Sequence, residues 1–370
     1  MRGKSVERRS ALSSDREALK AAFLDANGFG DARREPLGGD ASTRAYERLH
    51  QDGETYIFMD QPPALESAPC PPLATADERR AAGYNALARL AAGRVDAFIA
   101  CALYLKGQGL SAPDILAADP GAGLAVLEDL GDDLFARLLE AGKADEAELY
   151  DAAIDALLAL HRRTPPEVLP PGWPLLKYDD LALETAQNVF VEWMPKLRPS
   201  LNFSAKALAD WEAIWAPIRA RGEAGATVFC HRDYHAENLI WLPKRKGAAR
   251  VGMLDFQDAV LAHPAWDLSM LLHDARRDVS SAREAESLAR YLKARPELDA
   301  DAFLADYHAL GALNVARILG IFARLVTRDD KPRYLAFMPR LWDYLDRCLA
   351  DPSLDDLKLW FERHVPEMAR

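Results

Sequence analysis

The stretch HRDYHAEN, residues 231–238, places a carboxylate and a carboxamide five positions apart. Asp233 is suited to accept the proton of a substrate hydroxyl or to orient that hydroxyl, and Asn238 is suited to ligate Mg²⁺. The stretch MLDFQD supplies a second oxygen ligand, Asp255, 17 positions further along the chain. Phosphoryl transfer needs mainly positioning and neutralisation of charge. Two metal ligands and one carboxylate at the hydroxyl therefore make up most of the required machinery.

The same spacing fits the H-R-D-x-x-x-x-N catalytic loop of kinases, with Asp255 in the place of the D-F-G aspartate. Taken singly, each residue also has a structural interpretation as a cap, a solvated side chain or a buried polar group. A zinc site built on His231 and His235 lacks a matching third ligand nearby. A protein kinase is disfavoured because no A-P-E motif follows the D-F-Q segment.

A glycine-rich turn, GGDAST, lies between strand-like segments near the other end of the chain. Glycines mark many turns, so this turn is a weak signal alone. Its order relative to the catalytic-loop motif predicts a loop that covers the phosphates of a nucleotide, with Gly38, Gly39 and Ser42 as nucleotide-binding residues.

Three longer stretches, CHRDYHAENLIW, MLDFQDA and HPAWDLSMLL, resemble the aminoglycoside phosphotransferase and choline kinase family, and the resemblance runs over residues 35–345. It implies a protein-kinase-like fold, ATP and Mg²⁺ as cofactors, and His231 and Asp267 as braces of the catalytic loop. It also implies that VLEDLGDDLF, residues 126–135, is a hinge where backbone groups of Glu128 and Leu130 hold the adenine edge.

Further stretches, including GGDASTRAYERL, MDQPP and GIFARLVTRDDKPRYLAFMPRLWDYL, resemble one branch of that family, the bacterial anomeric kinases for N-acetylmuramate and N-acetylglucosamine. The resemblance implies ATP-dependent phosphorylation of the C1 hydroxyl of these free sugars in peptidoglycan recycling. The residues themselves predict only a hydroxyl acceptor and a nucleotide donor. A kinase for an aminoglycoside, choline or homoserine remains an alternative, as does a catalytically inactive nucleotide-binding module.

The stretch YIFMDQPP, residues 56–63, departs from the family pattern. Related phosphotransferases carry a basic residue on this strand that grips the α- and β-phosphates, and Met59 falls on that position. A methionine offers neither charge nor a donor. We expect Arg44, just past the glycine-rich turn, to supply the missing cation; the alternative is that Arg44 points to solvent.

Candidate acceptor-binding residues lie in the second half of the chain. Glu192 and Trp193 could bind a pyranose by hydrogen bonding and stacking, although an aromatic residue on a helix is more often part of the core. Arg317, like Arg324 two turns later, could bind a lactyl carboxylate through a bidentate pair, or could lie on a solvated face.

The elements that must position these residues form an α+β, bilobal pattern. Residues 1–130 are expected to form an N-lobe with a small antiparallel sheet, the glycine-rich loop and the hinge, and residues 131–370 a mainly helical C-lobe. Predicted strands include Ala45–His50, Thr55–Asp60 and Leu124–Leu127, and helical patterns cover 15–29, 77–91, 95–108 and 302–326. The segment Ala64–Arg94 is either a lid or a surface insertion.

Composition limits the remaining possibilities. The net charge of −11 disfavours a general nucleic-acid binder, and no continuous apolar stretch predicts a signal peptide or a membrane span. The four cysteines are widely separated, as expected for reduced thiols of a cytoplasmic protein. We expect the partners to be ATP and a small-molecule amino sugar, and no obligate protein partner is evident.

Overall fold

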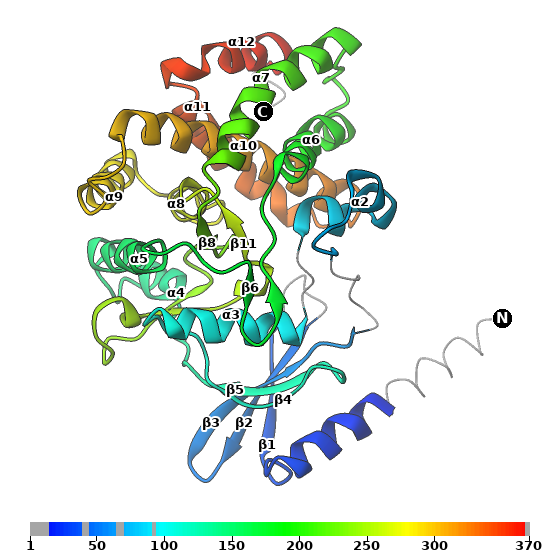
Figure 1. The fold of residues 1–370 in the computed structure, drawn as a ribbon, viewed down its shortest axis with the longest axis vertical. Coiled ribbons are helices and arrows are strands. Elements are labelled where there is room, and N and C mark those ends of the chain that lie inside the picture. Colours follow the sequence, from blue (N-terminus) through cyan, green and yellow to red (C-terminus); the bar gives the residue numbers. More distant parts are fainter. Residues whose placement is uncertain (1–14, 39–43, 64–69, 91–93, 367–370) are drawn as a thin grey trace, which may run out of the picture.

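The computed structural model describes residues 15–38, 44–63, 70–90 and 94–366. Its N-lobe is built on one five-stranded antiparallel sheet in the order β1-β2-β3-β5-β4 (Figure 1). The strands are β1 (Arg33–Leu37), β2 (Ala45–Gln51), β3 (Glu54–Asp60), β4 (Ile115–Asp119) and β5 (Leu124–Glu128). The predicted strands are confirmed to within one residue at either end, and β1 was not predicted.

A tight turn sets the register of β2 against β3. Asp52 and Gly53 both have positive φ, 53° and 84°, which is the conformation that a two-residue hairpin turn requires. The register places Tyr46 opposite Met59. Because side chains alternate along a strand, Ile57 and Met59 share one face of the sheet and Phe58 lies on the other.

The two faces of the sheet are covered by different helices. Phe58 packs with Leu24 of the helix at residues 15–26 and with Val126 in a small separate core. Met59 belongs to the large core, together with Phe98 and other side chains of α3 (Val95–Gly107). Figure 1 shows α3 between the sheet and the C-lobe, so this helix joins the two halves of the molecule.

The helix predicted at 77–91 is broken in two. The structure has α2 (Ala76–Ala82) and a π-helical turn, η2 (Asn85–Arg89). Gly83 ends the first piece with φ of 91°, a conformation that a residue with a Cβ adopts only under strain. Both pieces lie against the C-lobe although they precede the hinge in sequence, and η2 packs on α6 (Asp180–Leu197).

The C-lobe is mainly helical, as predicted. Its other helices are α4 (Phe135–Glu140), α5 (Glu146–Leu160), α7 (Ala205–Ala224), α8 (Ala265–Leu272), α9 (Ser281–Lys293), α10 (Ala300–Thr327), α11 (Met338–Cys348) and α12 (Asp355–His364). Its short strands are β6 (Val168–Leu169), β7 (Trp173–Pro174), β8 (Val228–Cys230), β9 (Leu239–Trp241), β10 (Val251–Met253) and β11 (Val260–Ala262).

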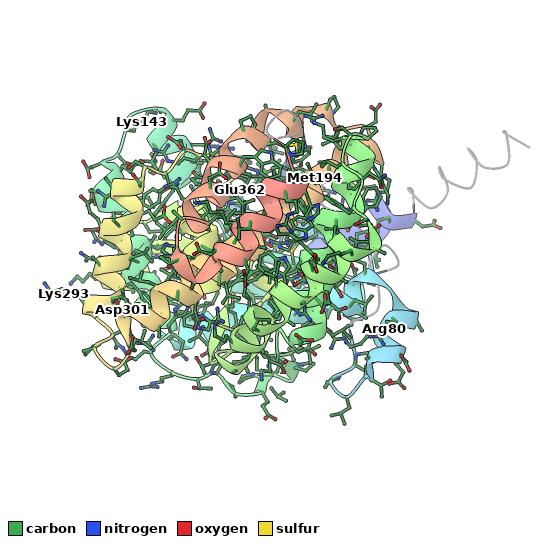
Figure 2. The ribbon with its side chains drawn as sticks, turned by 90° about the horizontal axis from the view of Figure 1, so that it is seen from above. Arg80, Lys143, Met194, Lys293, Asp301 and Glu362 are labelled. Atoms are coloured by element: carbon green, nitrogen blue, oxygen red, sulfur yellow. The ribbon has the colours of Figure 1, made fainter. Side chains whose placement is uncertain are left out.

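Helix α10 is the centre of this lobe and packs against α6, α8 and α11. It is long and apolar enough to cross a membrane by length and composition, but 78% of its apolar window is buried inside the protein. It is therefore a core helix by its packing. Viewed from above, the exposed side chains of Arg80, Lys143 and Lys293 lie at the edge of the lobe, whereas Met194 is buried among the helices (Figure 2).

Candidate active site

Two small two-stranded sheets hold the predicted catalytic residues. Strand β8 pairs with β11, and β9 pairs with β10. Asp233 and Asn238 lie in the loop between β8 and β9, and Asp255 follows β10. The Leu254 N–H donates to the Asn238 carbonyl at 2.9 Å, which ties the two loops together. The structure therefore brings the three residues of the sequence motif to one place.

Asp267 in the first turn of α8 braces the catalytic loop. Its carboxylate accepts the backbone N–H of His231 at 2.6 Å and that of Arg232 at 2.8 Å. This bracing matters because Arg232 has a positive φ of 78°, which is strained for a residue with a side chain. Burial raises the pKa of Asp267, and these hydrogen bonds partly offset the rise. The implied role of Asp267 is confirmed.

His231 braces the loop in a different way from Asp267. Its ring is buried and, within the described part of the chain, makes no hydrogen bond; it packs edge-on against Tyr234 and Phe256. Burial lowers its pKa, and the surrounding carboxylates offset this only in part. The His231 ring is therefore neutral and fills the space beneath the loop.

The side chain of Asp233 is available to a substrate. It is partly buried, and among the described residues its carboxylate accepts no hydrogen bond from the protein; only its backbone carbonyl does so, from His235 N and from Asn238 Nδ2. The Asn238 Nδ2 contact, at 2.9 Å, fixes the amide so that its oxygen points away from the loop backbone and can face a ligand.

Asp255 is held by two neighbours. Arg44 Nη2 and Gln257 Nε2 both donate to its Oδ1, at 2.5 Å and 2.9 Å. Burial alone would raise the pKa of this carboxyl, but the charge of Arg44 and these hydrogen bonds lower it below its usual value. Asp255 is therefore ionised at neutral pH, and its Oδ2 has no hydrogen-bond partner among the described residues.

A cavity of about 370 Å³ lies between the lobes. It is lined by the predicted residues Gly38, Glu128, Leu130, Asn238 and Asp255. The N–H of Glu128 already donates to the Asp114 carbonyl at 2.8 Å, so that donor is not free for a nucleotide. The other two glycine-rich loop residues predicted to bind the nucleotide, Gly39 and Ser42, lie outside the described residues.

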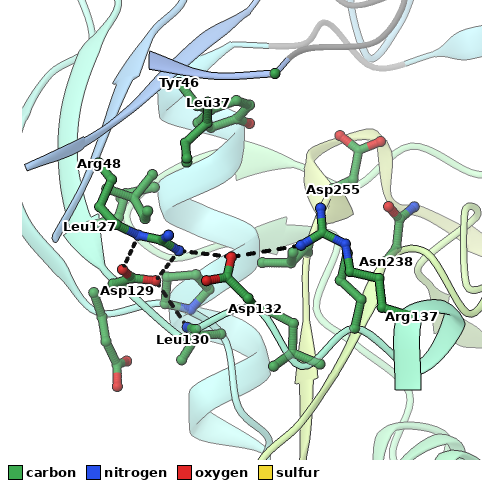
Figure 3. A pocket seen from close by; sticks show the side chains of 18 of the residues that line it. Leu37, Tyr46, Arg48, Leu127, Asp129, Leu130, Asp132, Arg137, Asn238 and Asp255 are labelled. Carbon is green, nitrogen blue, oxygen red and sulfur yellow. Dashed lines mark hydrogen bonds and ion pairs between the residues drawn. The ribbon is translucent and has the colours of Figure 1, made fainter. Parts of the chain in front are cut away.

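A chain of ion pairs crosses this cavity, from Arg48 at one side to Arg137 on the side of Asn238 and Asp255 (Figure 3). Arg48 of β2 contacts Asp129 at 2.7 Å and Asp132 at 3.0 Å, and Arg137 of α4 lies 3.8 Å from Asp132. Arg48 and Arg137 line the cavity and were not predicted. No sequence motif marks them, because each becomes relevant only when the two lobes are brought together.

A second cavity, of about 260 Å³, opens on the other side of Asp255. Asp233, His235 and Arg317 line it, and Asp255 lines both cavities. His235 Nδ1 is buried and has no hydrogen-bond partner among the described residues. From the sequence, this histidine was expected to be a buried polar residue rather than a zinc ligand, and it is buried. It lines the same cavity as Asp233, the residue predicted to be catalytic.

The predicted acceptor-binding residues do not all come together. Arg317 lies in the second cavity, so its alternative position on a solvated face is wrong. Glu192 and Trp193 do not line that cavity; Glu192 is exposed, and Lys196 pairs with Glu192 at 3.3 Å and lies 3.7 Å from the centre of the Trp193 ring. The contribution of these two residues to acceptor binding stays a prediction.

The position of Met59 is as the sequence suggests, on the cavity-facing side of β3 and fully buried. Arg44 does not point to solvent. Its guanidinium is buried against Asp255, Gln257 and the Tyr46 hydroxyl. The alternative of a solvent-facing Arg44 is therefore wrong, and whether Arg44 binds the phosphates stays a prediction.

The donor set fits Mg²⁺ bound together with a nucleotide. No cluster of three or more His, Cys, Asp or Glu side chains able to hold a metal occurs in the described ranges. Mg²⁺ does not need one, because it is commonly held by one or two carboxylates, water and substrate phosphates. Asn238 and Asp255 both line the first cavity, and an amide oxygen and a carboxylate suit such a partly hydrated ion.

The chain is similar in sequence to known phosphotransferases, as the geometry of the site leads us to expect. A model of the phosphotransferase enzyme family matches residues 33–304. An N-acetylmuramate/N-acetylglucosamine kinase of Caulobacter vibrioides is 75% identical over 97% of this chain and 99% of its own. A protein of the same name from Pseudomonas aeruginosa is 31% identical, over 90% of this chain and 89% of its own.

The fold is similar to that of a solved kinase. The crystal structure of choline kinase LicA from Streptococcus pneumoniae superposes with a TM-score of 0.54 over 90% of this chain and 99% of its own, at 16% sequence identity. At this identity the likeness shows the fold alone. It confirms the predicted protein-kinase-like, bilobal α+β architecture.

Proposed function

The chain belongs to the phosphotransferase enzyme family, and we propose that it is an ATP-dependent kinase that phosphorylates the C1 hydroxyl of N-acetylmuramate and N-acetylglucosamine. In this role it would act in the cytoplasm, where ATP is available and peptidoglycan sugars are recycled. The identity of 75% to a curated kinase for these two sugars supports the choice of acceptor.

One structural observation carries the proposal: Asp255 lines both cavities, with Asn238 on the first side and Asp233 on the second. A nucleotide in the first cavity would place its terminal phosphate at Asp255. An acceptor in the second would place a hydroxyl at Asp233. Transfer between the two then needs no movement of either substrate across the site.

Each residue of the site has a separate role in the proposed reaction. Asp233 accepts or orients the acceptor hydroxyl, and its carboxylate is free to do so. Asp255 and Asn238 hold Mg²⁺, which when bound neutralises the charge of the phosphates. Asp267 holds the catalytic loop rigid, so that the Asp233 carboxylate is already positioned before the substrate arrives.

The second cavity carries charges of both signs, because three carboxylates and two guanidinium groups line it. A cationic acceptor such as an aminoglycoside or choline is expected to need a strongly acidic pocket, and the presence of Arg276 and Arg317 makes this lining mixed instead. A mixed lining is compatible with a neutral or anionic sugar. The choice of the amino sugars therefore rests mainly on the 75% identity to the curated kinase.

The test is to incubate the protein with ATP, Mg²⁺ and each sugar. We expect phosphate on C1, detected by phosphorus NMR and by loss of the reducing end. Asp233→Asn should keep ATP binding and lose turnover by roughly 10²-fold or more, because proton transfer or hydroxyl orientation is removed. Phosphate on C6, or no product from either sugar, would contradict the proposal.

A further inference from the structure

Arg317 is a buried cation in the second cavity without an acidic partner. The residue is only 9% exposed. Its Nε and Nη2 donate to the amide oxygen of Asn314 at 3.0 Å and 2.8 Å, and the guanidinium lies 5.7 Å from the centre of the Trp266 ring. Within the described ranges, no carboxylate lies at ion-pair distance from it, and its Nη1 makes no hydrogen bond.

Such an arrangement is costly in the free protein. A charge removed from water is normally paired, since the amide and the ring supply only partial compensation. The other arginine of this cavity differs, because Arg276 pairs with Glu237 at 2.9 Å. Arg317 is thus the cation of the second cavity that is left for an anionic ligand.

The surroundings of Arg317 would strengthen such a contact. Ile318, Ile321 and Phe322 line the cavity beside it, and an apolar environment increases the attraction between opposite charges. Asn314 fixes one edge of the guanidinium, so the remaining edge is presented in one orientation. A planar carboxylate is the group that matches a fixed guanidinium edge best.

The two sugars of the proposed function differ in this chemical group. N-acetylmuramate is N-acetylglucosamine with a lactyl ether on O3, and it therefore carries a carboxylate that the other sugar lacks. We propose that Arg317 binds the lactyl carboxylate of N-acetylmuramate while Asp233 faces its C1 hydroxyl. This inference rests on the proposed function and adds the residue that sets the preference between the two substrates.

The experiment measures kcat/KM for both sugars in the wild type, Arg317→Gln and Arg317→Lys. In Arg317→Gln we expect the ratio of N-acetylmuramate to N-acetylglucosamine to fall about 10- to 100-fold, the loss typical of a charged hydrogen bond. The change should appear mainly in KM for N-acetylmuramate, because the carboxylate is remote from the reacting atoms. Arg317→Lys keeps the charge without the fork and should fall in between.

N-acetylglucosamine turnover reports whether each variant is folded. Arg324→Gln is the matched control, since Arg324 lies two turns along α10, against Tyr84 and not in the lining of the cavity; it should keep the wild-type ratio. An unchanged ratio in both Arg317 variants, or an equal loss on both sugars, would overturn the inference and leave the proposed function standing. A wild type that phosphorylates neither sugar would overturn both.

Discussion

At the scale of single residues, Arg44 and Asp255 form a close ion pair at the proposed metal site. The guanidinium of Arg44 is 2.5 Å from a carboxylate that we assign to the metal. Its position on that carboxylate lowers the pKa of Asp255 and keeps it ionised. A cation at this point would also lie close to the phosphates that bind through the same metal, which could compensate for the methionine on β3.

We therefore expect Arg44→Ala to raise the KM for ATP clearly more than the KM for the sugar, by roughly 10-fold if one charged hydrogen bond is lost. The Mg²⁺ concentration needed for half-maximal activity should change as well. Steady-state kinetics with ATP, sugar and Mg²⁺ varied in turn provide the measurement. Met59→Leu is the control and should leave all three values near those of the wild type. Unchanged ATP kinetics in Arg44→Ala would refute this role.

The sequence predicts some of these residues better than others for a physical reason. Asp233 and Asn238 are five positions apart in one loop, so local spacing is enough to identify them. Arg44 reaches Asp255 across 211 positions, and only the folded chain shows that it meets the metal ligand. The sequence places Arg317 on a helix as a candidate ligand. Helical periodicity does not show that this side chain is buried and that, among the described residues, no carboxylate pairs with it.

Among the strands, β1 was missed although β2 and β3 were predicted. The sequence of β1, RREPL, has three charged residues and a proline, and so lacks the alternation that marks a half-buried strand. It is an edge strand, where proline is tolerated because one side of the ladder is unpaired. The hairpin β2–β3 was predicted because Asp52–Gly53 is a strong turn signal.

The pair formed by β3 and α3 explains how a methionine can stand at position 59. In protein kinases a lysine of β3 pairs with a glutamate of the adjacent helix. Here none of the buried side chains of α3 is charged, and its acid, Asp96, pairs with Arg94 at 2.9 Å. Packing of Met59 of β3 against side chains of α3 thus takes the place of the ion pair between a lysine and a glutamate.

A lysine at position 59 would therefore lack a partner. We expect Met59→Lys to lower the free energy of unfolding by about 3–5 kcal/mol, the cost typical of an uncompensated buried charge, without lowering the KM for ATP. Met59→Leu, which keeps the volume, should cost less than about 1.5 kcal/mol. Urea unfolding of the three proteins checks this. A Met59→Lys protein of wild-type stability with tighter ATP binding would show that the strand still has an acidic partner.

The segment around α2 and η2 links the lobes more closely than a surface insertion would. Arg79 is buried and donates to the Ala86 carbonyl at 2.9 Å and to Asp179 at the start of α6. Arg232 of the catalytic loop donates to the Ala88 carbonyl at 2.7 Å. The described part of this segment is therefore packed against helices of the C-lobe, although it precedes the boundary predicted between residues 130 and 131.

At the scale of the whole molecule, a histidine that is buried without charge should make the fold sensitive to acid. His161 at the end of α5 is fully buried, and its Nδ1 lies 2.9 Å from the Tyr291 hydroxyl of α9. Burial, with smaller contributions from Arg295 and His263, lowers the pKa of His161 to about 3, from an ordinary value of 6.5. The folded protein therefore excludes a proton that the unfolded chain binds over this whole interval.

The sign of the effect follows from that difference. Well above pH 6.5 His161 is neutral in both the folded and the unfolded state, so it causes no loss of stability there. As the pH falls from 6.5 towards 3, the unfolded state gains the proton and stability is lost, by at most about 1.4 kcal/mol per pH unit.

The variant His161→Asn tests this effect, because its side chain can still bond to Tyr291 but cannot titrate. Between about pH 7 and pH 5 the wild type should therefore lose roughly 2 kcal/mol more than the variant in urea unfolding. Between about pH 7 and pH 8 the two proteins should change in parallel, because His161 is neutral in both states there. Equal losses in the acid range would show that His161 does not contribute to the acid sensitivity of the fold.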